Sequence, residues 1–98
     1  MIGYRFLSPA EEEMVAAALF YEDASAGLGA DFLDCVQFAL DRARRYPNSG
    51  SPIAQRFRAI LLPNFPFSLI YAYESDEIVI VALAHQSRRP NYWLERTD

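Results

Sequence analysis

The sequence contains no lysine, although nine of its 98 residues are basic. All nine are arginines, whose planar guanidinium groups stay protonated and donate hydrogen bonds as a fork. Such side chains are suited to anchoring anions and unsuited to abstracting protons. The net charge of −4 also argues against sequence-independent binding of nucleic acid, because such binding depends on neutralising phosphates.

Cysteine and long apolar runs are also scarce. The single cysteine, Cys35, cannot form an internal disulfide, which is typical of a protein in a reducing cytoplasm. No apolar run is long enough to span a membrane, and the N-terminus lacks the basic and apolar segments of a signal peptide. With 52% apolar and 22% charged residues, the chain is expected to fold as a single cytoplasmic domain over residues 1–98.

The strongest structural signal lies in the C-terminal third of the chain. Two short runs, Phe67–Tyr73 and Ile78–Ala84, are rich in β-branched and aromatic residues and flank the polar turn Glu74–Glu77. This pattern predicts a β-hairpin. The second run is apolar on both faces, which indicates a central strand whose second face is at least partly covered.

The N-terminus predicts a strand followed by a helix. Ile2–Leu7 alternates as a short strand, and the helix that follows is expected to end at about Ala24. Ser8 is expected to cap this helix, with Pro9 in its first turn and Glu11 closing a capping box. Three adjacent acids complement the positive end of the helix dipole and fan out too widely to form a metal site: Glu11, Glu12 and Glu13.

A second helix is expected over Leu28–Tyr46, because seven apolar residues recur there at helical spacing. These residues are Leu28, Phe32, Cys35, Val36, Ala39, Leu40 and Ala43. Cys35 lies within this stripe and is therefore interpreted as a small core residue rather than a nucleophile. The last turn carries cations that favour the helix dipole, Arg42, Arg44 and Arg45, and Pro47 ends the helix.

Residues 47–52 are expected to form a loop, followed by a strand over Gln55–Leu62. The order strand, helix, helix, strand, strand, strand (βααβββ) predicts an α+β fold. In this fold the helical hairpin packs on one face of a small, mainly antiparallel sheet. The opposite face, which is expected to carry Arg56 and Arg58, then has no cover within the chain. A half-exposed face of this kind favours binding of a partner.

The last predicted strand runs into a segment that is dense in side chains able to bind or react. It reads His85-Gln86-Ser87-Arg88-Arg89-Pro90-Asn91-Tyr92-Trp93 and includes the only histidine and the only tryptophan. Histidine is the side chain type that ordinarily titrates near neutral pH, so His85 could act as an acid or a base. The alternatives are that His85 ends the strand with a bond to a backbone carbonyl, and that the two aromatic residues pack this segment against the sheet.

Three segments in this order resemble the RelE/ParE superfamily of toxins from bacterial type II toxin–antitoxin modules. They are FYEDASAGLGADFLDCVQFALDRARRYP, QRFRAILLPNFPFSLIYAY and IVIVALAHQSRRPNYW, and they cover most of the chain. The ending AHQ-x-R-R-P-x-Y-W is the most specific and is similar to that of ParE-like members. The resemblance implies a toxin that is neutralised by a cognate antitoxin protein in a hetero-oligomer. RelE-like members cleave messenger RNA in the ribosome, whereas ParE-like members poison DNA gyrase.

RNA cleavage through the 2′-hydroxyl requires a base, a leaving-group acid and cations beside the phosphorus. On the RelE-like reading the catalytic residues would be His85, Arg58, Arg88 and Tyr92, with Arg56 beside them. The absence of lysine, the single histidine and the acidic composition argue against this chemistry. The candidate partner-binding residues on either reading are Arg56, Arg58, Arg88, Arg89, Tyr92 and Trp93.

Three hypotheses remain open, in this order. The first is a ParE-like toxin that binds a protein target such as gyrase without covalent chemistry. The second is a ribosome-dependent endoribonuclease, and the third is an antitoxin-binding module with little toxicity. None of them requires a cofactor, a metal or a membrane, and in each the antitoxin should be held mainly by apolar burial.

Overall fold

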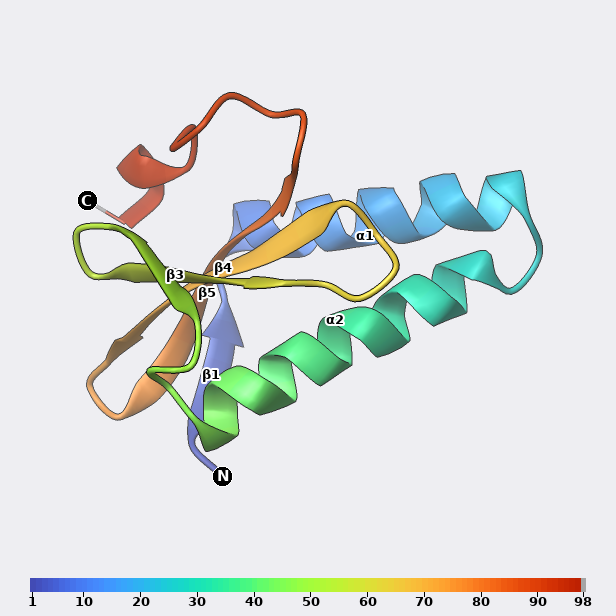
Figure 1. The fold of residues 1–98 in the computed structure, drawn as a ribbon. Coiled ribbons are helices and arrows are strands. Elements are labelled where there is room, and N and C mark those ends of the chain that lie inside the picture. Colours follow the sequence, from blue (N-terminus) through green and yellow to red (C-terminus); the bar gives the residue numbers. More distant parts are fainter. Residues whose placement is uncertain (98) are drawn as a thin grey trace.

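The computed structural model describes residues 1–97 and shows two antiparallel helices on one face of a sheet (Figure 1). The elements are β1 (Gly3–Phe6), α1 (Ser8–Ala24), α2 (Leu28–Arg45), β2 (Ser51–Ala54), β3 (Phe57–Leu61), β4 (Phe67–Glu74), β5 (Glu77–His85) and a 3-10 helix, η1 (Leu94–Thr97). The strands lie in the order β1-β5-β4-β3-β2. Strand β1 is parallel to β5, and the other pairs are antiparallel. The predicted α+β class and helical hairpin are confirmed, and none of the helices described is long and apolar enough to cross a membrane.

Strand β2 is an addition to the predicted order, which becomes βααββββ. The predicted loop over residues 47–52 is wrong at its end, because Ser51 and Pro52 already pair with Ala59 and Arg58 of β3. The sequence did not predict this strand because proline cannot donate a hydrogen bond to a neighbouring strand and therefore argues against a strand. Proline is tolerated here because β2 is the edge strand of the sheet.

Helix α1 starts without the predicted cap. Leu7 is extended and occupies the N-cap position, and the structure shows no side-chain hydrogen bond that caps this end. Ser8 is already helical, so the predicted capping box of Ser8 with Glu11 is wrong. The reason is that Leu7 N–H donates to Ile80 O at 3.0 Å, which prolongs the contact between β1 and β5 up to the helix.

The turn between the helices is held by one carboxylate. Gly27 has φ of 90°, a left-handed conformation that favours glycine. The Glu22 carboxylate accepts the N–H groups of Gly27 and Gly29, both at 3.0 Å. A Cβ on Gly29 would lie 2.6 Å from Ala18 O, so this glycine permits the close approach of α2 to α1.

The first core lies between the helices and the sheet. The predicted stripe of α2 is confirmed, since Phe32, Val36, Ala39, Leu40 and Ala43 are buried there. Cys35 packs against this core from a partly buried position. Aromatic rings from α1, α2, β4 and the loop before β4 fill the end of the core near the helix–helix turn: Tyr21, Phe32, Phe65 and Phe67.

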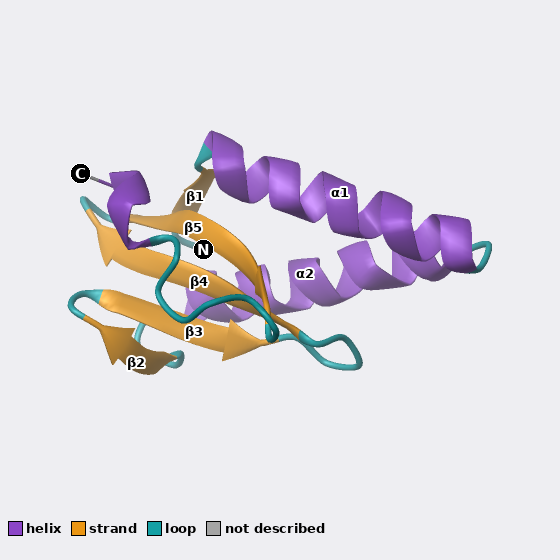
Figure 2. Cartoon of the chain, turned by 90° about the horizontal axis from the view of Figure 1, so that it is seen from above, coloured by secondary structure: helices purple, strands orange, loops and turns teal. Residues whose placement is uncertain are grey.

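A second core lies on the other face of the sheet, which was expected to be uncovered. The residues after β5 cross this face, on the side opposite the two helices (Figure 2). Trp93 packs there with buried residues of three strands: Phe57, Ile70, Ala72, Val81 and Ala82. A bulge in β5 contributes, because Ile70 pairs with Ala82 and Tyr71 with Ile80, which leaves Val81 unpaired. The prediction of a bare second face is therefore wrong.

Candidate functional site

Residues 86–97, here called the C-terminal strap, hold most of the predicted site residues. Trp93 fixes the strap to the sheet, with 2% of its surface exposed. Its ring meets the Phe57 ring edge-on, with the centroids 4.9 Å apart. Tyr92 and Leu94 pack against the same core from partly buried positions. The aromatic residues of this segment therefore pack it against the sheet, as one of the two alternatives for the segment expected.

Glu13 of α1 is the second anchor of the strap. Its carboxylate accepts two hydrogen bonds from Arg96, at 2.8 and 3.0 Å, and one from the Tyr92 hydroxyl at 2.5 Å. It also accepts Leu83 N–H at 3.2 Å, and Arg88 Nη1 lies 4.0 Å away. The side chains of Glu13 and Arg96 are 17% and 19% exposed, so the pair is well shielded from solvent. Sequence reasoning placed Glu13 only at a helix start, because nothing in the sequence links it to Arg96, 83 positions away.

The Tyr92 hydroxyl is held in its protonated form. Burial, followed by the hydrogen bond to Glu13 and the charge of Glu13, raises the pKa of Tyr92 to about 12. Two guanidinium groups oppose this shift, with Arg88 3.9 Å and Arg96 5.0 Å from the ring centroid. A tyrosine that stays protonated can donate a hydrogen bond to Glu13, and in this way Tyr92 has a structural role.

This raised pKa predicts a pH dependence at alkaline pH. Because the folded-state pKa exceeds the ordinary value near 10, the contribution of Tyr92 to stability is fully present below about pH 10. It is lost as the pH rises towards 12. The difference in absorbance at 295 nm between wild type and Tyr92→Phe should show one tyrosine that titrates later than the free amino acid. A difference curve centred near pH 10 would contradict the Glu13 contact.

His85 ends β5 with its ring turned back on the chain. Its Nδ1 accepts the backbone N–H of Ser87 at 3.0 Å, so the proton of the neutral ring lies on Nε2. The ring also packs edge-on against Phe67, at 5.0 Å between centroids. His85, Arg88 and Arg89 line a shallow hollow of about 250 Å³ beside the strap.

Arg56 and Arg58 lie elsewhere. Arg58 is opposite Tyr71 in the β3–β4 pair and therefore shares the helix-facing side of the sheet, so its predicted place on the opposite face is wrong. Its guanidinium donates to Gly50 O at 2.8 Å and to Asn48 O at 3.2 Å. Arg56 pairs with Glu74 at 2.9 Å and lies over the Phe57 ring. The structure brings Arg88, Tyr92 and His85 to one end of the sheet and keeps Arg58 apart from them.

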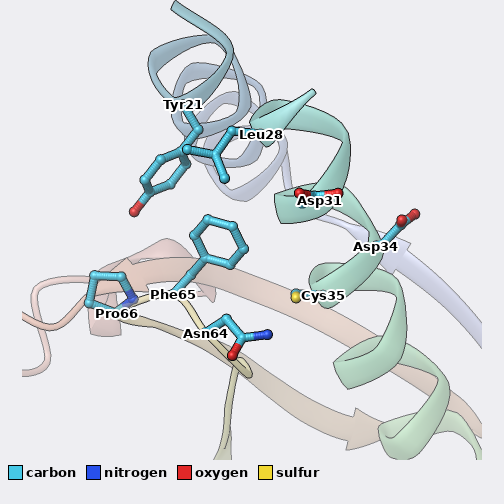
Figure 3. A pocket seen from close by; sticks show the side chains of 8 residues that line it. All are labelled: Tyr21, Leu28, Asp31, Asp34, Cys35, Asn64, Phe65 and Pro66. Atoms are coloured by element: carbon cyan, nitrogen blue, oxygen red, sulfur yellow. The ribbon is translucent and has the colours of Figure 1, made fainter. Parts of the chain in front are cut away.

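A larger hollow of about 580 Å³ opens on the helix side of the molecule (Figure 3). Tyr21, Leu28, Phe65 and Pro66 supply its apolar wall, and Asp31 and Asp34 of α2 stand beside it. Within residues 1–97 no three His, Cys, Asp or Glu side chains lie close enough to hold a metal ion.

A helical hairpin on a five-stranded mixed sheet, with this C-terminal ending, defines the RelE/ParE superfamily of small toxins. The chain belongs to the ParE toxin family of type II toxin–antitoxin systems (parDE), whose sequence profile matches residues 4–90. A solved structure described as the chromosomal ParDE system from P. aeruginosa is similar, with a TM-score of 0.72 and 17% identity. The match covers 87% of this chain and 96% of that one, and it shows a shared fold. No curated protein sequence gives a significant match.

Proposed function

We propose that this protein is the toxin of a toxin–antitoxin module, acts in the cytoplasm and is neutralised by a cognate antitoxin. Its target is a protein, such as DNA gyrase, and its action is binding without covalent chemistry. The observation that carries the proposal is the family match over residues 4–90. The geometry of the strap supports the choice of a protein target.

RNA cleavage would require groups that converge on one phosphate. The Tyr92 hydroxyl already donates a hydrogen bond to Glu13 at 2.5 Å, and His85 Nδ1 accepts the backbone N–H of Ser87. Arg58 Nη1 donates to two backbone carbonyls on the other side of the sheet. Arg89 is exposed and has no side-chain partner among residues 1–97, which favours its role in contacting a partner.

The antitoxin is expected to cover apolar side chains that the fold leaves in solvent. Both helices, the residue after α2 and the end of β3 carry them: Val15, Leu19, Phe20, Phe38, Tyr46 and Leu61. Aromatic and aliphatic groups in such number favour a protein partner.

Expression alone and with the neighbouring open reading frame tests this function. Growth should stop when the toxin is expressed alone and resume when the neighbouring protein is co-expressed. Primer extension on translated messages should show an unchanged pattern. New cleavage within codons would instead establish the endoribonuclease, and unimpaired growth would establish a binding module with little toxicity.

A further inference from the structure

The shallow hollow beside the C-terminal strap joins an apolar surface to positive charge. It has a volume of about 250 Å³ and lies on the face of the sheet that the strap crosses. Four residues of strands β2 to β5 form its apolar part: Ile53, Ala59, Ile70 and Ala84. Arg88 and Arg89 of the strap line it as well, and no carboxylate does so among the described residues. The hollow is therefore complementary in charge to an anion that carries an apolar group beside it.

The two arginines of this hollow keep their donors free. Arg89 is exposed, and its side chain has no hydrogen bond or ion pair within residues 1–97. The Arg88 side chain is 54% exposed, and its Nη1 lies 4.0 Å from a carboxylate oxygen of Glu13, beyond hydrogen-bond distance. That carboxylate already accepts hydrogen bonds from Arg96 and Tyr92. Both guanidinium groups can therefore bind an external acceptor.

The backbone that carries these arginines is fixed before any partner binds. At the start of the strap, Gln86 N–H donates to Pro66 O at 2.8 Å. The turn over residues 89–92 is closed by Tyr92 N–H, which donates to Arg89 O at 3.3 Å. Pro90 restricts both its own backbone and that of Arg89. A partner therefore loses little affinity to the ordering of this segment.

Two kinds of anion could meet these guanidinium groups, a nucleic-acid phosphate or a protein carboxylate. Proteins that bind unpaired nucleotides commonly stack the bases on open aromatic rings. Tyr92 does not offer an open ring of this kind, because Arg88 lies over it at 3.9 Å, and Trp93 is only 2% exposed. The net charge of −4 also opposes the approach of a polyanion. These observations favour a carboxylate on a protein.

We propose that this hollow binds an acidic segment of the protein target. Arg88 and Arg89 hold one carboxylate of that segment through charge-assisted hydrogen bonds, and a neighbouring apolar side chain lies on Ala59, Ile70 and Ala84. This inference rests on the proposed function, since it names the chemistry by which the target is recognised. Because both arginines are exposed, the contact weakens as the salt concentration rises.

Photo-crosslinking identifies what occupies the hollow. A benzophenone amino acid is placed at Ile53, which lines the hollow and is 40% exposed, in toxin expressed without its antitoxin. The crosslinked product should be sensitive to protease, and mass spectrometry should place the crosslink beside an acidic residue of the target. Exchange of that acid for arginine should restore inhibition by Arg89→Glu toxin. A product sensitive to nuclease, a target segment without acidic residues, or no product would overturn the proposal.

Graded expression separates this site from the proposed function. The amount of toxin needed to stop growth, measured by immunoblot, should be at least tenfold higher for Arg89→Glu than for wild type. The matched control is Arg45→Glu, which should stay within twofold because Arg45 is an exposed arginine of α2 that does not line the hollow. Far-UV circular dichroism checks that both variants fold.

The two failures are distinguishable. Equal potency of Arg89→Glu and wild type would refute the site for an acidic segment and leave the proposed function standing. Unimpaired growth at high levels of the wild-type protein would refute both.

Discussion

Trp93→Ala is expected to lower the free energy of unfolding by about 3–5 kcal/mol, as is usual when a buried large aromatic is truncated in a core. Trp93 is 2% exposed and packs edge-on against Phe57, so its loss leaves a cavity in the second core. The strap would also lose its main apolar contact with the sheet. Urea denaturation followed by circular dichroism measures the effect.

Phe20→Ala is the matched control for this change, because Phe20 is an aromatic that lies mostly in solvent. Its truncation should alter the free energy of unfolding by less than about 0.5 kcal/mol. Equal losses in the two variants would mean that Trp93 is not buried against the sheet in solution.

Glu13→Ala is expected to cost about 2–3 kcal/mol, because it leaves the Arg96 guanidinium, the Tyr92 hydroxyl and Leu83 N–H without their acceptor. This expected loss of stability is smaller than that for breaking a fully buried ion pair, since the Glu13 and Arg96 side chains both retain some exposure. The pKa of Tyr92 should fall towards its ordinary value in the same variant. Thermal and urea unfolding measure the first effect, and absorbance titration the second.

Glu12→Ala is the control for the Glu13 substitution, because Glu12 precedes it on α1 and is exposed. A double-mutant cycle with Arg96→Ala isolates the pairwise contribution, since the two substitutions should be clearly non-additive. Additive effects would show that Glu13 and Arg96 act independently, contrary to the observed bidentate contact.

The elements that could be predicted from the sequence are those with strong local signals. The β4–β5 hairpin follows from its two apolar runs, and its two-residue turn places Ser75 and Asp76 at φ of 53° and 60°. The helical spacing of the apolar residues in α2 likewise predicts which face of that helix is buried. The apolar character of both faces of β5 indicates the cover that the strap provides on the second face.

The features that escaped prediction depend on contacts far apart in the sequence. Glu13 gives no local sign of its bond to Arg96, and Leu7 displaces Ser8 from the cap because of pairing with β5. The face on which Arg58 lies is set by which side of β3 the helices cover. Alternation along a strand separates two faces and does not say which one the helices occupy. The roles of His85, Arg88 and Arg89 stay predictions.

DNA supercoiling by purified gyrase is the assay that distinguishes whether this ParE-family toxin acts by binding that protein. Adding the toxin in increasing amounts should reduce supercoiling, and prior mixing with the antitoxin should restore it. His85→Ala should leave the inhibition of supercoiling in place, because no bond-breaking chemistry is required. Gyrase that remains fully active at high toxin concentration would contradict the claim for this target.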